Sequence, residues 1–477
     1  MARPTDPLRA AGALFSITLL AVSGCGEAPP DAPAAPDTTG PALTAAEQIV
    51  AMLEDPAPYH SVPPELFAEL GWDLPDGGAT VTALADAAPG GAFDPRALET
   101  IPADVLGYTA EWHEVRFETY GLDWDIGGLE LTPATGGENL PTMVIINGGA
   151  ANWYEFFIGS KNEPGLAQYL AQRVPVLLVT IPGNYRHGGW PGTDFGERIP
   201  AYLLDRDVSA EEAKIRNAIY TFRVVANGVE ALVNEALEGP IVMIGHSTGG
   251  ELQFILKDAL ADRLRGLSMG WGTGGPAGLE SMQAFRGRRT IDEYPHVSQL
   301  RARTSDQYSR GYLGPLNPFW DPAKTRLEIA AEWMGAEQHR RAQFKQPLQD
   351  MEHSSMDYLK PEIAGQIRET LEGNELGIDP EAVIDDLFLT MESPVTGYEK
   401  MIWTTARLDT GHWDEDPEQA RELLIADEFR AANPDIPIRV LVFDVPMTHY
   451  GHLEKPRELA GGLVAALTWL VRPDPAQ

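Results

Sequence analysis

The sequence has a single cysteine and few basic residues. With Cys25 alone, the chain can form neither an internal disulfide nor a cluster of thiolate metal ligands, so packing must hold the fold together. Its 36 Lys and Arg stand against 70 Asp and Glu, which gives a formal net charge of −34. Such a surface repels phosphate groups. The charge therefore argues against nucleic acid as a partner and against direct attraction to anionic lipid headgroups.

The sequence also lacks an apolar run of the roughly 18 residues that a membrane-spanning helix requires. Residues 11–22 are apolar but too few, and they follow a start that carries Arg3 and Arg9. A basic start, a short apolar run and small residues are typical of a secretory signal. The ending Val22-Ser23-Gly24-Cys25 resembles a bacterial lipobox, in which the cysteine is acylated and becomes the new N-terminus.

The lipobox resemblance implies a signal peptide over residues 1–24 and a lipid anchor on Cys25. The protein would then be exported and held at a membrane of the cell envelope. An ordinary secretory signal with an incidental cysteine is the alternative. Residues 25–43 are dominated by Pro, Ala and Asp and predict an extended tether, whereas residues 44–110 mix short helical patterns with Pro and Gly and predict an extension packed on the main domain.

From residue 111 onward, strand-like and helix-like segments alternate, which is the pattern of a sheet covered by helices on both faces. The middle strands are continuous apolar runs, as in buried parallel strands, while the first two alternate like an antiparallel edge. Eight strands are predicted, over residues 114–120, 127–134, 142–148, 174–181, 241–245, 264–271, 400–406 and 438–444. The sequence therefore predicts an α/β fold with a mostly parallel sheet flanked by helices.

About 125 residues separate the sixth and seventh predicted strands, far more than an ordinary loop. This segment, residues 275–399, has helical patterns and is rich in Met, Tyr and Arg. We expect it to form a helical cap over the carboxyl edge of the sheet. The core of the domain would then consist of residues 111–274 and 400–473.

The sequence Gly245-His246-Ser247-Thr248-Gly249 follows one predicted strand and precedes a predicted helix. A G-x-S-x-G motif in this context is typical of a nucleophile elbow, where a serine stands on a tight turn that requires small neighbours. The helix that follows would stabilise negative charge on a bound oxygen. The alternative is a glycine-rich strand end with an ordinary serine.

A serine hydroxyl needs a base to remove its proton, and the chain has histidines after its last predicted strand. With the order of elements above, the segment His449-Tyr450-Gly451-His452-Leu453-Glu454-Lys455-Pro456 resembles the α/β-hydrolase superfamily. The resemblance implies an α/β-hydrolase fold and makes His449 the general base, with His452 as second choice. The histidine pair could bind a metal in principle, but no third ligand or H-E-x-x-H accompanies it, so we expect neither metal nor cofactor.

The superfamily places its acidic triad residue after the sixth or seventh strand, in the chain order Ser, acid, His. The sixth predicted strand runs into a segment without a carboxylate, whereas the seventh leads to Asp409. Asp409 is therefore the preferred acid. Asp414 and Asp416 are its competitors, and a turn-forming Asp before Gly is the structural alternative for Asp409.

Backbone N–H groups would bind the oxyanion of the reaction. One donor is expected at Thr248, beside the nucleophile. The other is expected at Gly149 or, as the alternative, Ala150, because Asn147-Gly148-Gly149 resembles the family's His-Gly-Gly turn with Asn in place of His. The structural alternative for this segment is a flexible Gly-Gly turn.

Aromatic residues follow the oxyanion turn and the fourth strand, at the edge of the sheet where ligands of open α/β sheets bind. We expect Trp153, Tyr154, Tyr185 and Trp190 to line a pocket for an apolar acyl or alcohol group. The sequence thus predicts a serine hydrolase that cleaves a small carboxylic ester through an acyl-enzyme. An amidase or peptidase, a lactonase and a thioesterase use the same triad, and a catalytically inert ligand-binding lipoprotein is the alternative from another class.

Overall fold

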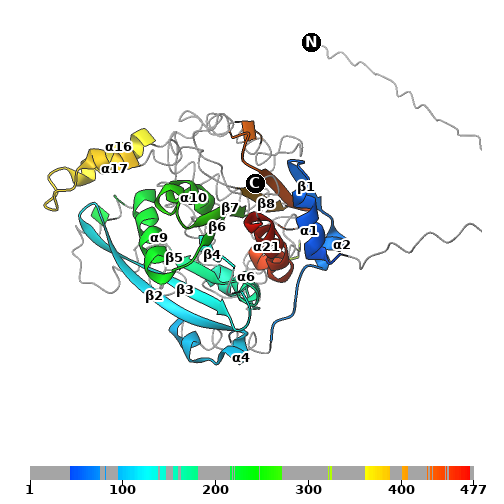
Figure 1. The fold of residues 1–477 in the computed structure, drawn as a ribbon. Helices are drawn as coiled ribbons and strands as arrows, with labels where there is room; N and C mark the ends of the chain where they lie inside the picture. The colour runs from blue at the N-terminus through cyan, green and yellow to red at the C-terminus, as the bar shows by residue number, and fades with distance from the viewer. Residues whose placement is uncertain are drawn as a thin grey trace, which may run out of the picture. The chain divides into compact units, whose positions relative to one another are not determined.

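A nine-stranded sheet lies at the centre of the fold, in the order β1-β9-β8-β7-β6-β4-β5-β3-β2 (Figure 1). Following this order across the sheet, every pair of neighbouring strands from β1 through β5 is parallel. The last two pairs, β5–β3 and β3–β2, are antiparallel. The strands are β1 (Tyr59–Val62), β2 (Tyr108–Thr119), β3 (Leu122–Pro133), β4 (Thr142–Ile146), β5 (Val176–Thr180), β6 (Ile241–His246), β7 (Leu264–Gly270), β8 (Met401–Ala406) and β9 (Ile438–Phe443). The predicted α/β fold with a mostly parallel sheet is confirmed.

The structure is a computed structural model, in which residues 43–477 form one compact unit. It describes residues 43–75, 81, 95–137, 140–146, 154–159, 163–180, 215–216, 219, 221–246, 248–270, 321, 323–324, 360–386, 400–406, 427, 430–431, 433–445, 447 and 451–472. None of the helices within these ranges is long and apolar enough to cross a membrane.

The prediction of eight strands is wrong by one. All eight predicted segments belong to the sheet, and β1 adds a ninth strand that comes from the N-terminal extension. The first two predicted strands are also longer than expected, because β2 and β3 form a continuous hairpin from Tyr108 to Pro133. β2 therefore begins inside the segment assigned to the extension.

Helices pack on both faces of the sheet and bury alternate side chains of each central strand. In β4, Val144 and Ile146 join one hydrophobic core, whereas Met143 and Ile145 join the other. The first core is completed by α9 (Phe222–Ala236), α10 (Thr248–Ala259), α16 (Lys360–Leu371) and α17 (Pro380–Asp386). The second includes side chains of α1 (Ala45–Glu54), α2 (Pro64–Ala68), α4 (Ala103–Leu106), α5 (Tyr154–Phe157), α6 (Leu166–Leu170), α20 (Gly451–Glu454) and α21 (Pro456–Val471), beside the 3₁₀ helix η2 (Pro95–Thr100).

The N-terminal extension packs tightly on the C-terminal part of the chain. Helix α1 starts at a capping box, in which the Thr44 side chain accepts from the Glu47 N–H and the Glu47 carboxylate accepts from the Thr44 N–H. A Cβ on Gly461 of α21 would overlap the carbonyl oxygen of Leu70 just after α2. Because the two backbones come this close, the extension is an integral part of the fold.

The parallel strands all end at one edge of the sheet, so the segments that follow them meet there. Ile146 of β4 pairs with Gly245 of β6, and Ala406 of β8 pairs with Phe443 of β9, so within each of these two pairs the strands end at nearly the same level. This carboxyl edge is where open α/β sheets bind ligands. The predicted catalytic segments all follow strands that end here.

Candidate active site

Most of the predicted site residues lie outside the described residues. These are Cys25, Gly149, Ala150, Trp153, Tyr185, Trp190, Ser247, Asp409, Asp414, Asp416 and His449. Tyr154 and Thr248 are placed only as backbone positions, the first residues of α5 and α10. His452 is described in full. The described part of the site is therefore the framework of strands and helices next to the predicted catalytic segments.

The G-x-S-x-G motif joins a buried strand to a helix. Every residue of β6 is buried, and the strand ends at His246. Helix α10 begins at Thr248, two residues later. The strand and the helix on either side of Ser247 are the structural context that a nucleophile elbow requires.

The packing at Gly245 explains the first glycine of the motif. A Cβ at this position would lie under 3.0 Å from the carbonyl oxygen of Gly249 and the Cα of Gly250, and it would also overlap the Gln253 side chain. The first turn of α10 therefore returns so close to the end of β6 that a side chain at 245 has no room. The close approach of backbone to backbone is the feature that the tight turn demands.

Three buried rings lie against one another beneath the carboxyl edge. They belong to Phe156, His246 and His452, which are exposed by 3%, 2% and 0%. Phe156 stacks on His452 with ring centroids 4.3 Å apart and planes 11° apart. His246 meets His452 edge-on at 4.8 Å and Phe156 at 5.7 Å.

This ring cluster joins three segments that the sequence analysis assigns to catalysis. Phe156 lies in α5, which follows the expected oxyanion turn. His246 directly precedes Ser247, and His452 lies in α20, three residues after His449. Edge-on and offset contacts between rings add about 0.5–1.5 kcal/mol per aromatic pair to the gain from burial. The cluster therefore fixes the three segments relative to one another.

Phe156 and His246 are not among the site residues predicted from the sequence. His246 stands inside the G-x-S-x-G motif, but its contact with Phe156 and His452 depends on three segments that converge only in the folded chain. His452, the second choice for the base, is fully buried within the cluster. A histidine enclosed in this way packs as a structural residue, and the first choice for the base, His449, lies outside the described residues.

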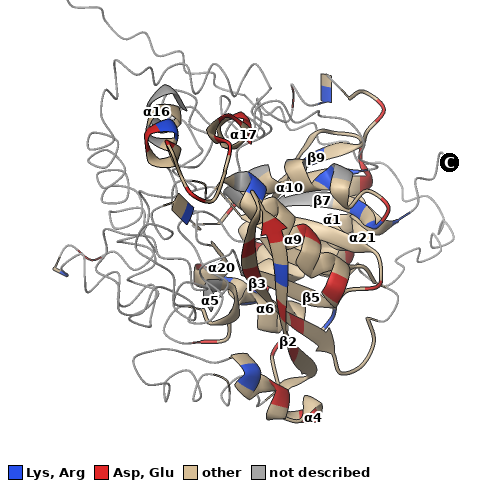
Figure 2. Ribbon diagram, turned by 90° about the vertical axis from the view of Figure 1, so that its left-hand side faces the viewer, with Lys and Arg blue, Asp and Glu red and all other residues tan. Residues whose placement is uncertain are grey.

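Among the described residues, one group has the ligand types of a metal site. Glu111 and His113 of β2 and Glu130 of β3 have ligand atoms within 4.8 Å of one another. The His113 Nε2 and Glu130 Oε2 atoms lie 2.9 Å apart, and this hydrogen bond raises the pKa of His113. Figure 2 shows acidic residues on β2, β3 and α9, and Glu111 is exposed. The hydrogen bond between His113 and Glu130 accounts for the closeness of these two side chains without a cation.

No protein-family model matches the chain, and no curated protein matches it in sequence. Several solved structures of hydrolases superpose on it at low identity. A laboratory-evolved variant of potato epoxide hydrolase is 14% identical, with a TM-score of 0.43 over 75% of this chain and 99% of that one. A thermophilic esterase from Thermogutta terrifontis is 15% identical, with a TM-score of 0.36 over 76% of this chain and 100% of the esterase.

A bacterial membrane phospholipase A described as a virulence factor is 16% identical to this chain, with a TM-score of 0.38 over 83% of this chain and 98% of that one. All three TM-scores lie below 0.5. The assignment of the α/β fold therefore rests on the strand order and pairing of the sheet.

Proposed function

We propose that the protein is a serine hydrolase that cleaves a carboxylic ester with the triad Ser247, His449 and Asp409. The observation that carries this proposal is the G-x-S-x-G motif between β6 and α10, with no room for a side chain at Gly245. An ordinary serine after a strand does not require the backbones to approach so closely. A serine nucleophile does, because its Oγ must stand clear of its neighbours.

In the proposed reaction, the Ser247 Oγ attacks the ester carbonyl carbon while His449 takes the serine proton. The tetrahedral intermediate then collapses, the bond to the alkoxy oxygen breaks, and His449 donates the proton to the leaving alcohol. Water attacks the acyl-enzyme with the same base, which releases the carboxylic acid and restores the serine. Asp409 would accept the second N–H of His449 and stabilise the imidazolium.

The N-terminus of α10 supports the expected oxyanion site. The helix runs for 12 residues from Thr248, and the first four N–H groups of a helix have no partner within it. These donors and the positive end of the helix dipole favour negative charge beside the nucleophile. The proposed oxyanion hole combines the Thr248 N–H with the Gly149 N–H from the segment after β4.

The proposed substrate is an ester with an apolar group, because the segments after β4 and β5 carry Trp153, Tyr154, Tyr185 and Trp190. The proposed location is the cell envelope, where acylated Cys25 would hold the protein on a membrane through the tether of residues 25–43. This location rests on the lipobox resemblance. It is tested by mass spectrometry of the N-terminal peptide, which would carry the lipid in the wild type and lose it in Cys25→Ser.

The decisive experiment for the mechanism is labelling of the purified protein with a fluorophosphonate, mapped by mass spectrometry. We expect one adduct on Ser247, with none in Ser247→Ala and a strongly reduced rate in His449→Ala. Asparagine variants of Asp409, Asp414 and Asp416 then identify the acid, because only the true partner of His449 should lower the labelling rate by orders of magnitude. A folded wild type that takes no label would overturn the proposal in favour of a binding lipoprotein.

A further inference from the structure

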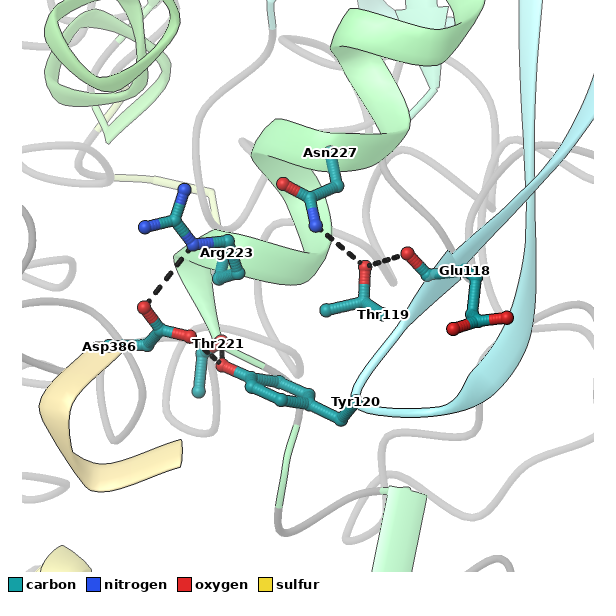
Figure 3. A network of polar contacts seen from close by, with 7 residues as sticks. All are labelled: Glu118, Thr119, Tyr120, Thr221, Arg223, Asn227 and Asp386. Carbon is teal, nitrogen blue, oxygen red and sulfur yellow. Dashed lines mark hydrogen bonds and ion pairs between the residues drawn. The ribbon is translucent and has the colours of Figure 1, made fainter. Parts of the chain in front are cut away.

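A polar network joins the long insert to the sheet (Figure 3). The Tyr120 hydroxyl donates to the Asp386 carboxylate at 2.5 Å and lies 2.9 Å from the Thr221 Oγ1. The other Asp386 oxygen accepts from the Arg223 Nε at 3.2 Å. Asp386 ends α17, which lies in the insert after β7, and its partners come from the β2–β3 turn and the start of α9.

The network lies at the carboxyl edge of the sheet. β3 pairs antiparallel with β5, and Gly127 stands opposite Thr180, the last residue of β5. Residues 122–126 and the turn at Tyr120 and Gly121 therefore project past the carboxyl end of β5. Helix α9 begins at this same edge, since it leads down to the start of β6. Figure 1 shows α16 and α17 beside this turn.

The β2–β3 turn presents Tyr120 in an unusual backbone conformation. Tyr120 has a φ of 56° and is the one non-glycine residue with positive φ in the described part of the chain. Bulky side chains rarely adopt this conformation, which favours Gly or Asn. The turn is also tied to α9, because the Asn227 side chain donates to the Thr119 Oγ1 at 2.9 Å. An aromatic residue at a position suited to glycine indicates that its side chain is needed there.

The burial of Tyr120 decides which atom donates in its hydrogen bond to Asp386. Desolvation, followed by the hydrogen bond to Asp386, raises the pKa of Tyr120, so its hydroxyl stays protonated and donates. The Asp386 side chain is only 17% exposed and accepts from both Tyr120 and Arg223. Hydrogen bonds to a charged acceptor are roughly twice as strong as neutral ones. The Asp386 carboxylate thus connects α17 both to the β2–β3 turn and to α9.

Helix α17, which ends at Asp386, forms one unit with α16. The Arg368 guanidinium on α16 donates to both Glu381 oxygens on α17, at 2.6 and 2.8 Å. The loop between them is closed by Asn374, whose side chain bonds to the backbone of Leu371 and Ile378. Buried apolar side chains of the pair join the core under α9: Ala364, Ile367, Leu371, Ile378, Val383 and Ile384.

We propose that Asp386 is a positioning residue that clamps the α16–α17 pair at the rim of the substrate site. This inference rests on the proposed hydrolase function for its link to the substrate. The clamp holds α16 and α17 against the sheet edge on the β3 and β5 side, so that this helix pair forms a fixed wall. A substrate long enough to reach the wall gains binding from it, whereas a small substrate does not.

The test compares Asp386→Asn and Tyr120→Phe with the control Asp385→Asn. Asp385 is exposed and adjacent, so its variant removes the same charge without touching the network. Hydrogen exchange of α16–α17 peptides is measured together with kinetics on p-nitrophenyl acetate and p-nitrophenyl octanoate. We expect exchange to rise about tenfold in both clamp variants, with a severalfold higher KM for the octanoate and unchanged kcat for the acetate. The control should behave like the wild type.

Two results would overturn the clamp. Unchanged exchange in both variants would show that apolar packing alone holds the helix pair. An equal loss of activity on both esters and of fluorophosphonate labelling would indicate a general loss of structure. If the wild type takes no label at Ser247, the hydrolase proposal fails, whereas the exchange data still decide whether Asp386 holds α16–α17.

Discussion

Replacing Gly245 with alanine should disable the proposed nucleophile while the rest of the fold remains. The added Cβ would overlap the Gly249 carbonyl oxygen and the Gly250 Cα, both backbone atoms in the first turn of α10. The fully buried Gln253 side chain would be displaced as well. To restore an ordinary contact, the start of α10 must move away from the end of β6 by about 1 Å, a displacement that costs roughly 10²-fold in rate when it misplaces a reacting group.

The same overlap has an energetic cost. Extra atoms forced into a packed region destabilise proteins by about 1–3 kcal/mol. We therefore expect Gly245→Ala to unfold at lower urea and to react with fluorophosphonate about 100 times more slowly than the wild type. The matched control is Gly239→Ala, in the loop just before β6, where a Cβ meets nothing within 4 Å.

The measurement is the second-order labelling rate of Ser247, taken beside a urea titration of each variant. A labelling rate within about threefold of the wild type in Gly245→Ala would refute the reasoning, because a rigid elbow cannot absorb the overlap. A similar loss in Gly239→Ala would refute it too. That outcome would show that an added methyl group slows labelling without any overlap with the first turn of α10.

Three further predictions concern packing and pH. Gly461→Ala should lower the free energy of unfolding by about 1–3 kcal/mol and expose the extension to protease, because its Cβ would overlap the Leu70 carbonyl oxygen. The control is Gly365→Ala, at an open helix position, and equal stability of the two variants would contradict the prediction. His452→Ala should lower both stability and the Ser247 labelling rate, and His452→Phe should restore part of the stability in a urea titration. His113 has a raised pKa, so its pairing with Glu130 stabilises the fold fully below about pH 6.5 and loses this effect as the pH rises through the folded pKa. The difference in unfolding free energy between the wild type and His113→Gln should therefore shrink as the pH rises through this window. A difference that does not change with pH would contradict the pairing.

The sheet could be predicted from the sequence because each of its eight expected strands carries a local signal. Runs such as Ile241–His246 are apolar and bounded by loop residues, so burial on both faces can be inferred from the segment alone. β1 has no such signal. It is four residues long, it follows a stretch rich in proline, and its partner β9 lies at the other end of the chain.

Residue type and spacing suggest a chemistry for the site, which stays a prediction, but the packing beneath the site could not be inferred from them. The motif around Ser247 is contiguous, so a nucleophile elbow can be predicted from a single segment. The cluster of Phe156, His246 and His452 depends on three segments that meet only after folding. The contact of Tyr120 with Asp386 spans 266 positions, and no local pattern encodes such a pair.

The pairing of β1 with β9 also sets an order of events during synthesis. The Arg439 Nε donates to the carbonyl oxygen of Leu53, 386 positions earlier, and Tyr59 pairs with Val440. The ribosome must therefore finish almost the whole chain before α1 and β1 can find their places. Contacts this distant in sequence slow folding, and until they form, the apolar edge strand β9 has open hydrogen-bonding groups. A chain that lost residues 45–62 would keep that edge uncovered and would tend to add strands from neighbouring molecules, so this short segment protects the finished protein from aggregation.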